Sequence, residues 1–183
     1  MTRAHYGMLA CYTVEFLALA IWIGGLVVIM GSVIPAVFNS FGMEPGGRFL
    51  TRVFDGYNRL VIVAIVMLLS AAGVRMLISS RHALAAAAPA RPEMFLLGLT
   101  ILSAVLIVVL LGPSSVALQE QAFTAKEGLA RKTAYAAFFR THMMVRALYL
   151  LNLILSIVLV AVKLNQLIRT GFRDHEKSHF SPR

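Results

Sequence analysis

Apolar residues fall into four long blocks along this chain, separated by short polar segments. The blocks cover about residues 9–38, 57–79, 93–118 and 134–167. As helices, all four are long enough to cross a hydrocarbon core of roughly 30 Å, which needs about 20 apolar residues. The pattern therefore predicts an all-α integral membrane protein, folded as a four-helix bundle within one membrane domain over residues 1–168.

Prolines and glycines predict where these helices bend or end. Pro35 lies near the end of the first block, where it would kink or terminate the helix. Residues 39–57 contain a proline and several glycines and predict a loop, with a short interfacial helix at 47–54. Residues 129–167 contain neither Pro nor Gly, which predicts an extended and partly amphipathic fourth helix. A basic polar tail follows at 169–183, and no internal repeat strong enough to claim is apparent.

Composition also places the chain in a membrane. Of its 183 residues 59% are apolar and 14% are charged, whereas roughly a quarter would be charged in a soluble domain. The net charge is +9, but the 17 Lys and Arg residues lie mostly between and after the spans. They are expected to meet the headgroups of a lipid bilayer rather than nucleic acid. We expect a bacterial inner membrane protein, with both termini placed in the cytoplasm by the distribution of Lys and Arg.

Charged and aromatic residues at the ends of the spans are expected to anchor the helices. Tyr57 and Arg59 begin the second span, and Arg75 and Arg81 end it, so that both ends can reach the headgroup layer. Lys163 is interpreted as the start of the polar C-terminal segment.

Polar residues inside the apolar blocks are informative, because each is costly in a bilayer. On the last helix, residues recur at spacings of 4, 3, 3 and 4, and they are His142, Arg146, Tyr149, Asn152 and Ser156. These spacings place them on one helical face. The face is expected to point toward other helices or water rather than lipid.

A second face lies on the first helix and consists of Cys11, Glu15 and Trp22, with Gly25 at its edge. We expect the two faces to meet, which would place Glu15 beside Arg146 or His142. The small residues Gly24 and Gly25 are expected to allow another helix to approach closely.

His142 is the residue in this pattern that could bind a cofactor. An imidazole can ligate a haem iron or a copper ion, and the adjacent Met143 and Met144 are soft ligands for copper(I). The alternative is that the polar residues hold the bundle together through interhelical hydrogen bonds. The sequence contains no Walker loop, dinucleotide fingerprint or cysteine-rich metal pattern. It therefore favours a protein that is not an enzyme.

Three segments carry a family resemblance, namely LALAIWIGGLVVIMGSVIPAVF (17–38), VFDGYNRL (53–60) and AFFRTHMMVRALYLLN (137–152). Together they resemble the transmembrane-protein-205-like bacterial family of four-helix membrane proteins, whose function is unknown. The resemblance implies family-pattern positions at Gly24, Gly25, Pro35, Tyr57, Arg59, Phe138, His142 and Asn152. The first span is also similar to that of the copper-resistance D family, although this chain has no histidine there.

These observations favour a non-catalytic integral membrane protein, which serves as an accessory or assembly subunit bound to other membrane subunits. A haem- or copper-linked redox or metal-handling protein that uses His142 is one alternative. A small transporter with Glu15, His142 and Arg146 along its polar path is another.

Overall fold

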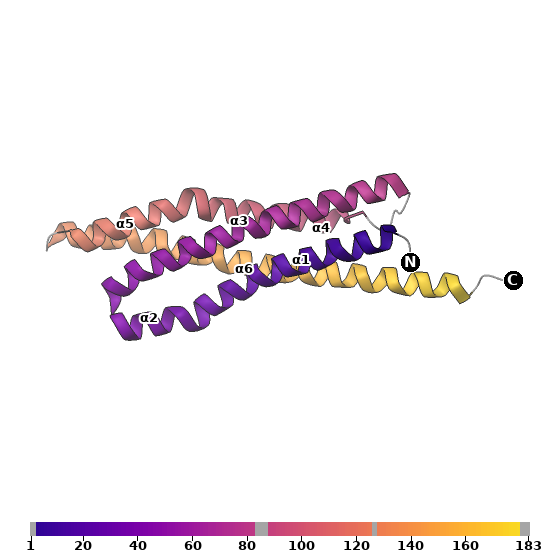
Figure 1. Cartoon of the computed structure of the whole chain (residues 1–183). Coiled ribbons are helices and arrows are strands. Elements are labelled where there is room, and N and C mark those ends of the chain that lie inside the picture. The colour runs from indigo at the N-terminus through magenta and orange to yellow at the C-terminus, as the bar shows by residue number, and fades with distance from the viewer. Residues whose placement is uncertain (1–2, 83–87, 126–127, 180–183) are drawn as a thin grey trace.

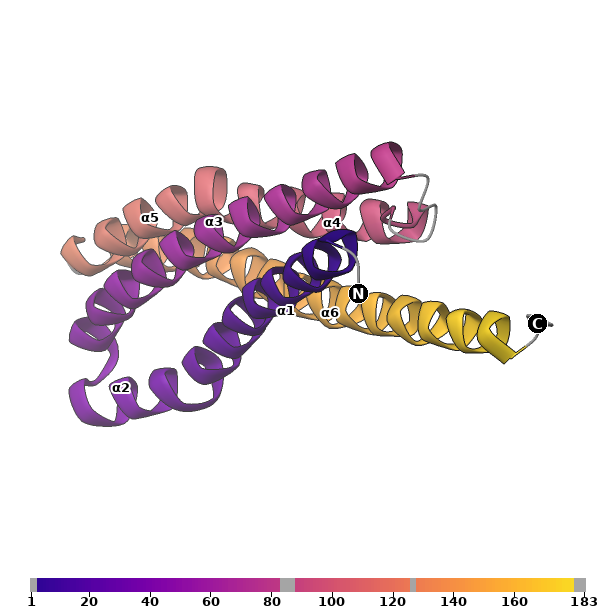
Figure 2. The same ribbon diagram turned by 45° about the vertical axis from the view of Figure 1, so that its right-hand side comes forward.

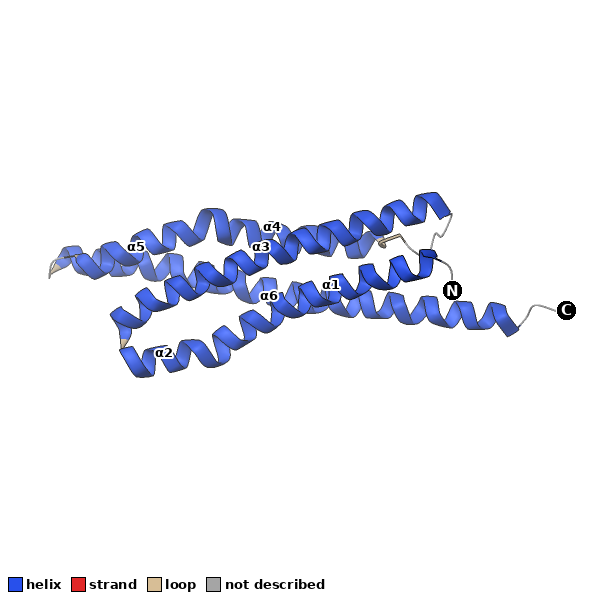
Figure 3. Cartoon of the chain, in the orientation of Figure 1, coloured by secondary structure: helices blue, strands red, loops and turns tan. Residues whose placement is uncertain are grey.

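The computed structural model of the chain describes residues 3–82, 88–125 and 128–179, with side chains over 6–81, 88–125 and 128–168. The described residues form α-helices and two short π-helical segments, without a strand (Figure 3). In chain order the elements are α1 (Arg3–Val28), η1 (Ile29–Val33), α2 (Ile34–Phe41), α3 (Met43–His82), α4 (Arg91–Val105), η3 (Leu106–Leu111), α5 (Gly112–Thr124) and α6 (Leu129–His179).

These elements combine into four long rods that lie side by side (Figure 1). The stretches of the rods that are long and apolar enough to cross a membrane are Tyr6–Phe41, Met43–Arg81, Arg91–Thr124 and Leu129–Ile168. The first and third rods each contain two α-helices joined by a π-helical segment, whereas the second and fourth are single helices. The predicted all-α, four-helix membrane bundle is confirmed.

The connection between the first two rods is much shorter than predicted. Only Gly42 interrupts the helices, with a positive φ of 75° that favours glycine. Pro45 lies in the first turn of α3, where a missing N–H group leaves no helical hydrogen bond unmade. The expected loop at 39–57 and the separate interfacial helix at 47–54 are therefore wrong, because most of this segment is the start of α3.

Both interrupted rods pass through a proline rather than ending at it. The N–H of Ile34, just before Pro35, bonds to the carbonyl of Ile29, and the N–H of Gly112, just before Pro113, bonds to the carbonyl of Ile107. These wider turns accommodate a ring that cannot donate a hydrogen bond and that crowds the preceding turn. A Cβ atom at Gly112 would lie 2.9 Å from the Ile107 oxygen, so this turn requires glycine.

The fourth rod is longer than the others. α6 has 51 residues, about 76 Å of helix at 1.5 Å per residue, and it runs beyond the other rods past the N-terminus (Figures 1 and 2). The extended fourth helix was predicted, but its backbone stays helical through His179, into the segment predicted as a tail. The remainder of that tail, 180–183, lies outside the described residues.

The four rods form two hairpins with the same internal pattern. Hairpin A is α1 to α3 and hairpin B is α4 to α6, and their turns lie at one end of the bundle while both chain termini lie at the other (Figures 1 and 2). Along the first rod of each, buried residues recur at equal spacings, at Glu15, Leu19, Trp22, Leu26 and Ile29 in one and at Glu93, Leu97, Thr100, Ala104 and Ile107 in the other. A π-helical segment and a proline follow at corresponding places.

The second rods of the hairpins correspond in the same way. Their buried residues are Val61, Ala64, Leu68, Ala71 and Arg75 in α3, and Tyr149, Asn152, Ser156, Leu159 and Lys163 in α6. The two hairpins therefore share one pattern of burial and charge, although the sequence shows no internal repeat of residue identities. The repeat lies in burial and charge rather than in residue identity, which is why the sequence concealed it.

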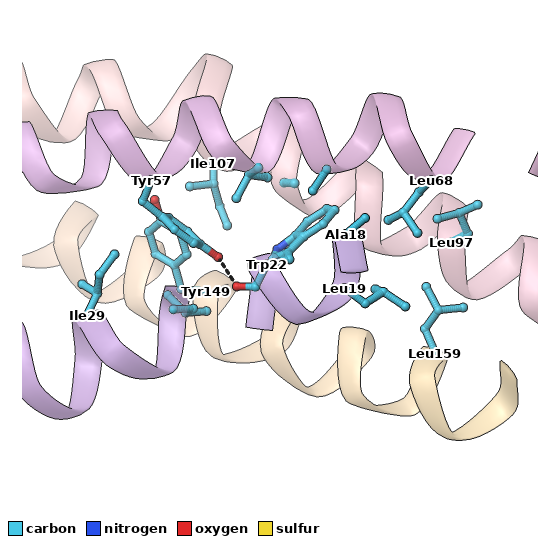
Figure 4. Close-up of a cluster of buried hydrophobic side chains, with 14 of the residues drawn as sticks. Ala18, Leu19, Trp22, Ile29, Tyr57, Leu68, Leu97, Ile107, Tyr149 and Leu159 are labelled. Carbon is cyan, nitrogen blue, oxygen red and sulfur yellow. Dashed lines mark hydrogen bonds between the residues drawn. The ribbon is translucent and has the colours of Figure 1, made fainter. Parts of the chain in front are cut away.

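The core lies where the rods meet. Leu19, Leu68, Leu97 and Leu159 come from the four different rods and are at most 2% exposed, and they lie together at one end of the apolar cluster (Figure 4). Trp22 occupies the middle of this cluster. The outer surface of the rods carries many exposed Leu, Ile and Val side chains, as a surface that faces lipid requires.

Candidate functional site

Each rod contributes one fully buried charged side chain to a single cluster. Glu15 lies on α1, Arg75 on α3, Glu93 on α4 and Lys163 on α6, and the exposed fraction of all four is 0%. We call these four residues the charge tetrad. Charged groups are so costly inside a membrane protein that a cluster of this kind is the first place to look for function.

Arg75 bridges the two acidic residues. Its Nη1 atom donates to Glu15 Oε2 at 2.9 Å and to Glu93 Oε1 at 2.7 Å. Its Nη2 atom donates to the hydroxyl of Tyr12 at 3.0 Å, and the guanidinium carbon lies 4.3 Å from the centre of the Tyr12 ring. The Nε–H group has no hydrogen-bond partner among the residues that the structure describes. The guanidinium is thus held by two carboxylates and an aromatic ring.

Lys163 bridges the same two acidic residues from the opposite hairpin. Its Nζ atom donates to Glu15 Oε2 at 2.8 Å and also to Glu93 Oε1. With all four groups ionised, two negative charges balance two positive charges, and the tetrad is neutral overall. Buried ions are tolerated only with such close pairing and hydrogen bonding.

Sequence reasoning missed three of these four residues. The sequence predicts Arg75 in the headgroup layer, Lys163 in the polar C-terminal segment and Glu93 simply at the start of the third span, but all three are buried. A signal was present in the sequence, because each is isolated among apolar residues. Arg75 is the only charged residue between Arg59 and Arg81, and no charged residue lies between Arg146 and Lys163.

The expected pairing of Glu15 with Arg146 or His142 is wrong. Glu15 binds Arg75 and Lys163 instead, while Arg146 is exposed and the His142 ring lies beside Phe138, with centroids 5.4 Å apart. The reason is axial position. Lys163 is the residue of α6 that is level with Glu15, and Arg146 lies about 26 Å from Lys163 along the helix axis.

The two predicted polar faces are found in part. Cys11, Glu15 and Trp22 all point into the bundle, which confirms the face on the first helix. On the last helix Tyr149, Asn152 and Ser156 are buried, but the face does not extend to Arg146.

A second polar layer lies between the tetrad and the turns of the hairpins. Tyr149 donates to Asn58 Oδ1 at 3.0 Å, and Asn152 donates to the Thr100 carbonyl at 2.9 Å and to Ser103 Oγ at 2.6 Å. These hydrogen bonds join α6 to α3 and α4. A cavity of about 10 Å³ in this layer has room for about one water molecule.

The Trp-Ile-Gly-Gly segment of the first helix belongs to this layer. The Tyr57 hydroxyl donates to the Trp22 carbonyl at 3.0 Å (Figure 4). Its ring lies so close to α1 that a Cβ at Gly25 would be 3.0 Å from it, whereas Gly24 faces open space. Within this chain the expected close approach is therefore found at Gly25 and not at Gly24, while an approach of another subunit to Gly24 stays a prediction.

Other residues singled out in the sequence lie at the surface. Pro35 is exposed, and Arg59 is exposed and pairs with Asp55 at 2.9 Å within α3. Among the described residues, no three His, Cys, Asp or Glu side chains are placed to share a metal ion. The interpretation of His142 as a cofactor ligand stays a prediction.

Comparison with known protein families identifies the family of this chain. Residues 17–124 match the family described as a domain of unknown function (DUF4149), over more than half of the chain. The chain belongs to this family. Comparisons with curated proteins and with solved structures gave no match. Membership in an uncharacterised family agrees with the sequence-based expectation, while the more specific resemblances to the transmembrane-protein-205-like and copper-resistance D families stay expectations.

Proposed function

We propose that this DUF4149 protein is a non-catalytic accessory or assembly subunit of a larger membrane complex. The observation that carries the proposal is the projection of α6 beyond the bundle. Among the residues of this helix whose side chains the structure describes, which end at Ile168, Lys163 is the last buried one. The helix continues to His179, about 24 Å further. A single helix of this length is marginal in water, so a partner that packs against it would account for its helical state.

The near part of this projection offers an apolar contact. Leu164 and Ile168 are exposed by 46% and 57%, and their spacing of four places them on one side of the helix. Two exposed apolar side chains next to a basic segment suit another membrane subunit that presents an apolar surface at the membrane boundary.

The interior of the bundle supports a structural role as well. The charged groups of the tetrad are neutralised by one another, and the polar path proposed for a small transporter requires Arg146 next to Glu15, where it does not lie. The geometry therefore gives that path no support.

Native electrophoresis of the tagged chain tests the proposal. Extracted from its own membrane in mild detergent, the 20.0 kDa chain should migrate within a larger assembly that contains other subunits. The double variant Leu164→Asn/Ile168→Asn should release it as a smaller species. The control Leu129→Asn changes an exposed leucine at the other end of α6 and should leave the assembly intact. Migration of the unmodified chain as a lone protein would contradict the proposal.

A further inference from the structure

The charge tetrad lies at the joint between the two hairpins. Hairpin A supplies Glu15 and Arg75, and hairpin B supplies Glu93 and Lys163. Each base binds the acid of its own hairpin and the acid of the other, so that two of the four ion pairs cross the joint, Arg75 to Glu93 and Lys163 to Glu15. The equivalent halves therefore meet through a ring of alternating charges.

The layer next to the tetrad is apolar. The four leucines Leu19, Leu68, Leu97 and Leu159 lie within about two turns of the tetrad along their helices and pack together. Apolar contacts of this kind are non-directional, and in a membrane lipid tails can replace them at little cost. The ion pairs are thus the part of the joint that specifies how the hairpins fit at this end.

The tetrad lies near the end of the bundle that carries the termini. Glu93 is in the first turn of α4, two residues after the exposed Arg91. Among the residues whose side chains the structure describes, the other titratable groups beside the tetrad come from α1 and are the Tyr12 hydroxyl and the Cys11 thiol. Glu93 therefore lies at the start of its helix, next to the connection between the two hairpins.

We propose that the charge tetrad is a proton-binding site, and that protonation of Glu93 lets the hairpins separate at the end that carries the termini. A proton added to Glu93 turns that carboxylate into a carboxylic acid, which holds the two bases less strongly. The tetrad then bears one net positive charge, and Arg75 and Lys163 face each other across a single carboxylate. Arg75 already has one donor without a partner among the described residues.

The chain contains its own reporter for this opening. Cys11 is the only cysteine, lies one turn before Glu15 on the same face of α1 and is 7% exposed. Its reaction with N-ethylmaleimide should be slow while the joint is closed. The matched control is the double variant Cys11→Ser/Thr13→Cys, which moves the thiol to the exposed outer face of the same helix.

The test compares labelling rates of the two proteins in detergent from about pH 8 to about pH 3, a range that extends well below the ordinary pKa of a carboxyl group. Acid lowers the thiolate fraction in both, so we measure the labelling rate of the unmodified chain divided by that of the control variant. We expect this ratio to rise about tenfold as the pH falls. A tenfold rise corresponds to a change of about 1.4 kcal/mol in the free energy of opening. A ratio that does not change with pH overturns it.

Two variants separate proton binding from a purely structural role. Glu93→Gln imitates the protonated side chain, and it should give Cys11 labelling that is fast relative to the control variant at every pH, with Trp22 emission still that of a buried indole. Lys163→Arg keeps the charge and should retain slow labelling at high pH and the rise in acid. If Glu93→Gln labels as slowly as the unmodified chain, or keeps the full acid response, the proposal is wrong. If that variant unfolds, the pH series on the unmodified chain decides.

Discussion

Removal of Lys163 should destabilise the bundle strongly. The change Lys163→Met keeps most of the side-chain volume but deletes an ammonium group that donates to Glu15 Oε2 at 2.8 Å and to Glu93. Charge-assisted hydrogen bonds contribute about 1.5–3 kcal/mol each. Arg75 still binds both acids, but the site now carries an unbalanced negative charge at 0% exposure. We therefore expect a loss of about 3–5 kcal/mol in the free energy of unfolding.

A double-mutant cycle shows whether this loss arises from the ion pair. Glu15→Gln alone should cost a similar amount, because it leaves an unbalanced positive charge. The double variant Glu15→Gln/Lys163→Met keeps the neutral pair of Arg75 and Glu93, so its cost should be well below the sum. The coupling free energy should be about 2–3 kcal/mol.

Trp22 provides the signal for the measurement. It is the only tryptophan and is 2% exposed, so its fluorescence should shift when the bundle unfolds in mild detergent titrated with sodium dodecyl sulfate. Arg146→Met, an exposed charge on the same helix, serves as the control and should change stability by less than about 0.5 kcal/mol. Additive single effects, or a loss below about 1 kcal/mol for Lys163→Met, would refute the reasoning.

Three further substitutions and one control test the polar layer in the same unfolding assay. Gly25→Ala should lower the free energy of unfolding by about 1–3 kcal/mol, because the new Cβ would lie 3.0 Å from the Tyr57 ring. Gly24 faces open space, so the control Gly24→Ala should leave the free energy of unfolding unchanged. Equal losses for the two variants would contradict this packing. Tyr57→Phe removes the hydrogen bond to the Trp22 carbonyl and should cost about 0.6 kcal/mol. Asn152→Leu removes two hydrogen bonds to α4 and should cost about 1–2 kcal/mol; an unchanged midpoint would show that these bonds add nothing.

The internal repeat illustrates how structure can reveal what residue identities hide. Trp22 corresponds to Thr100, and Leu26 to Ala104, so equivalent positions carry side chains of different size and polarity. What the hairpins share is the spacing of buried positions, a π-helical segment before a proline, and one acid and one base at one end. A comparison of burial and charge detects this pattern, whereas a comparison of residues does not.

The sequence by itself determined that this chain is a bundle of four membrane-spanning helices. The length of each apolar block can be compared directly with the thickness of a bilayer. The inward face of Cys11, Glu15 and Trp22 follows from the helical period. The sequence also pointed to Glu15 as a buried charge that needs a partner.

Only the tertiary structure decided which residues are its partners. Glu15 binds Arg75 and Lys163, which lie 60 and 148 positions away in the chain, and a pairing across such distances depends on how four helices align along their axes. The lengths of the turns set that alignment, and the sequence indicated a long loop where one residue, Gly42, suffices. Helix formation depends on residues that are close in the chain. The charge tetrad depends on the positions of the four rods relative to one another along their axes.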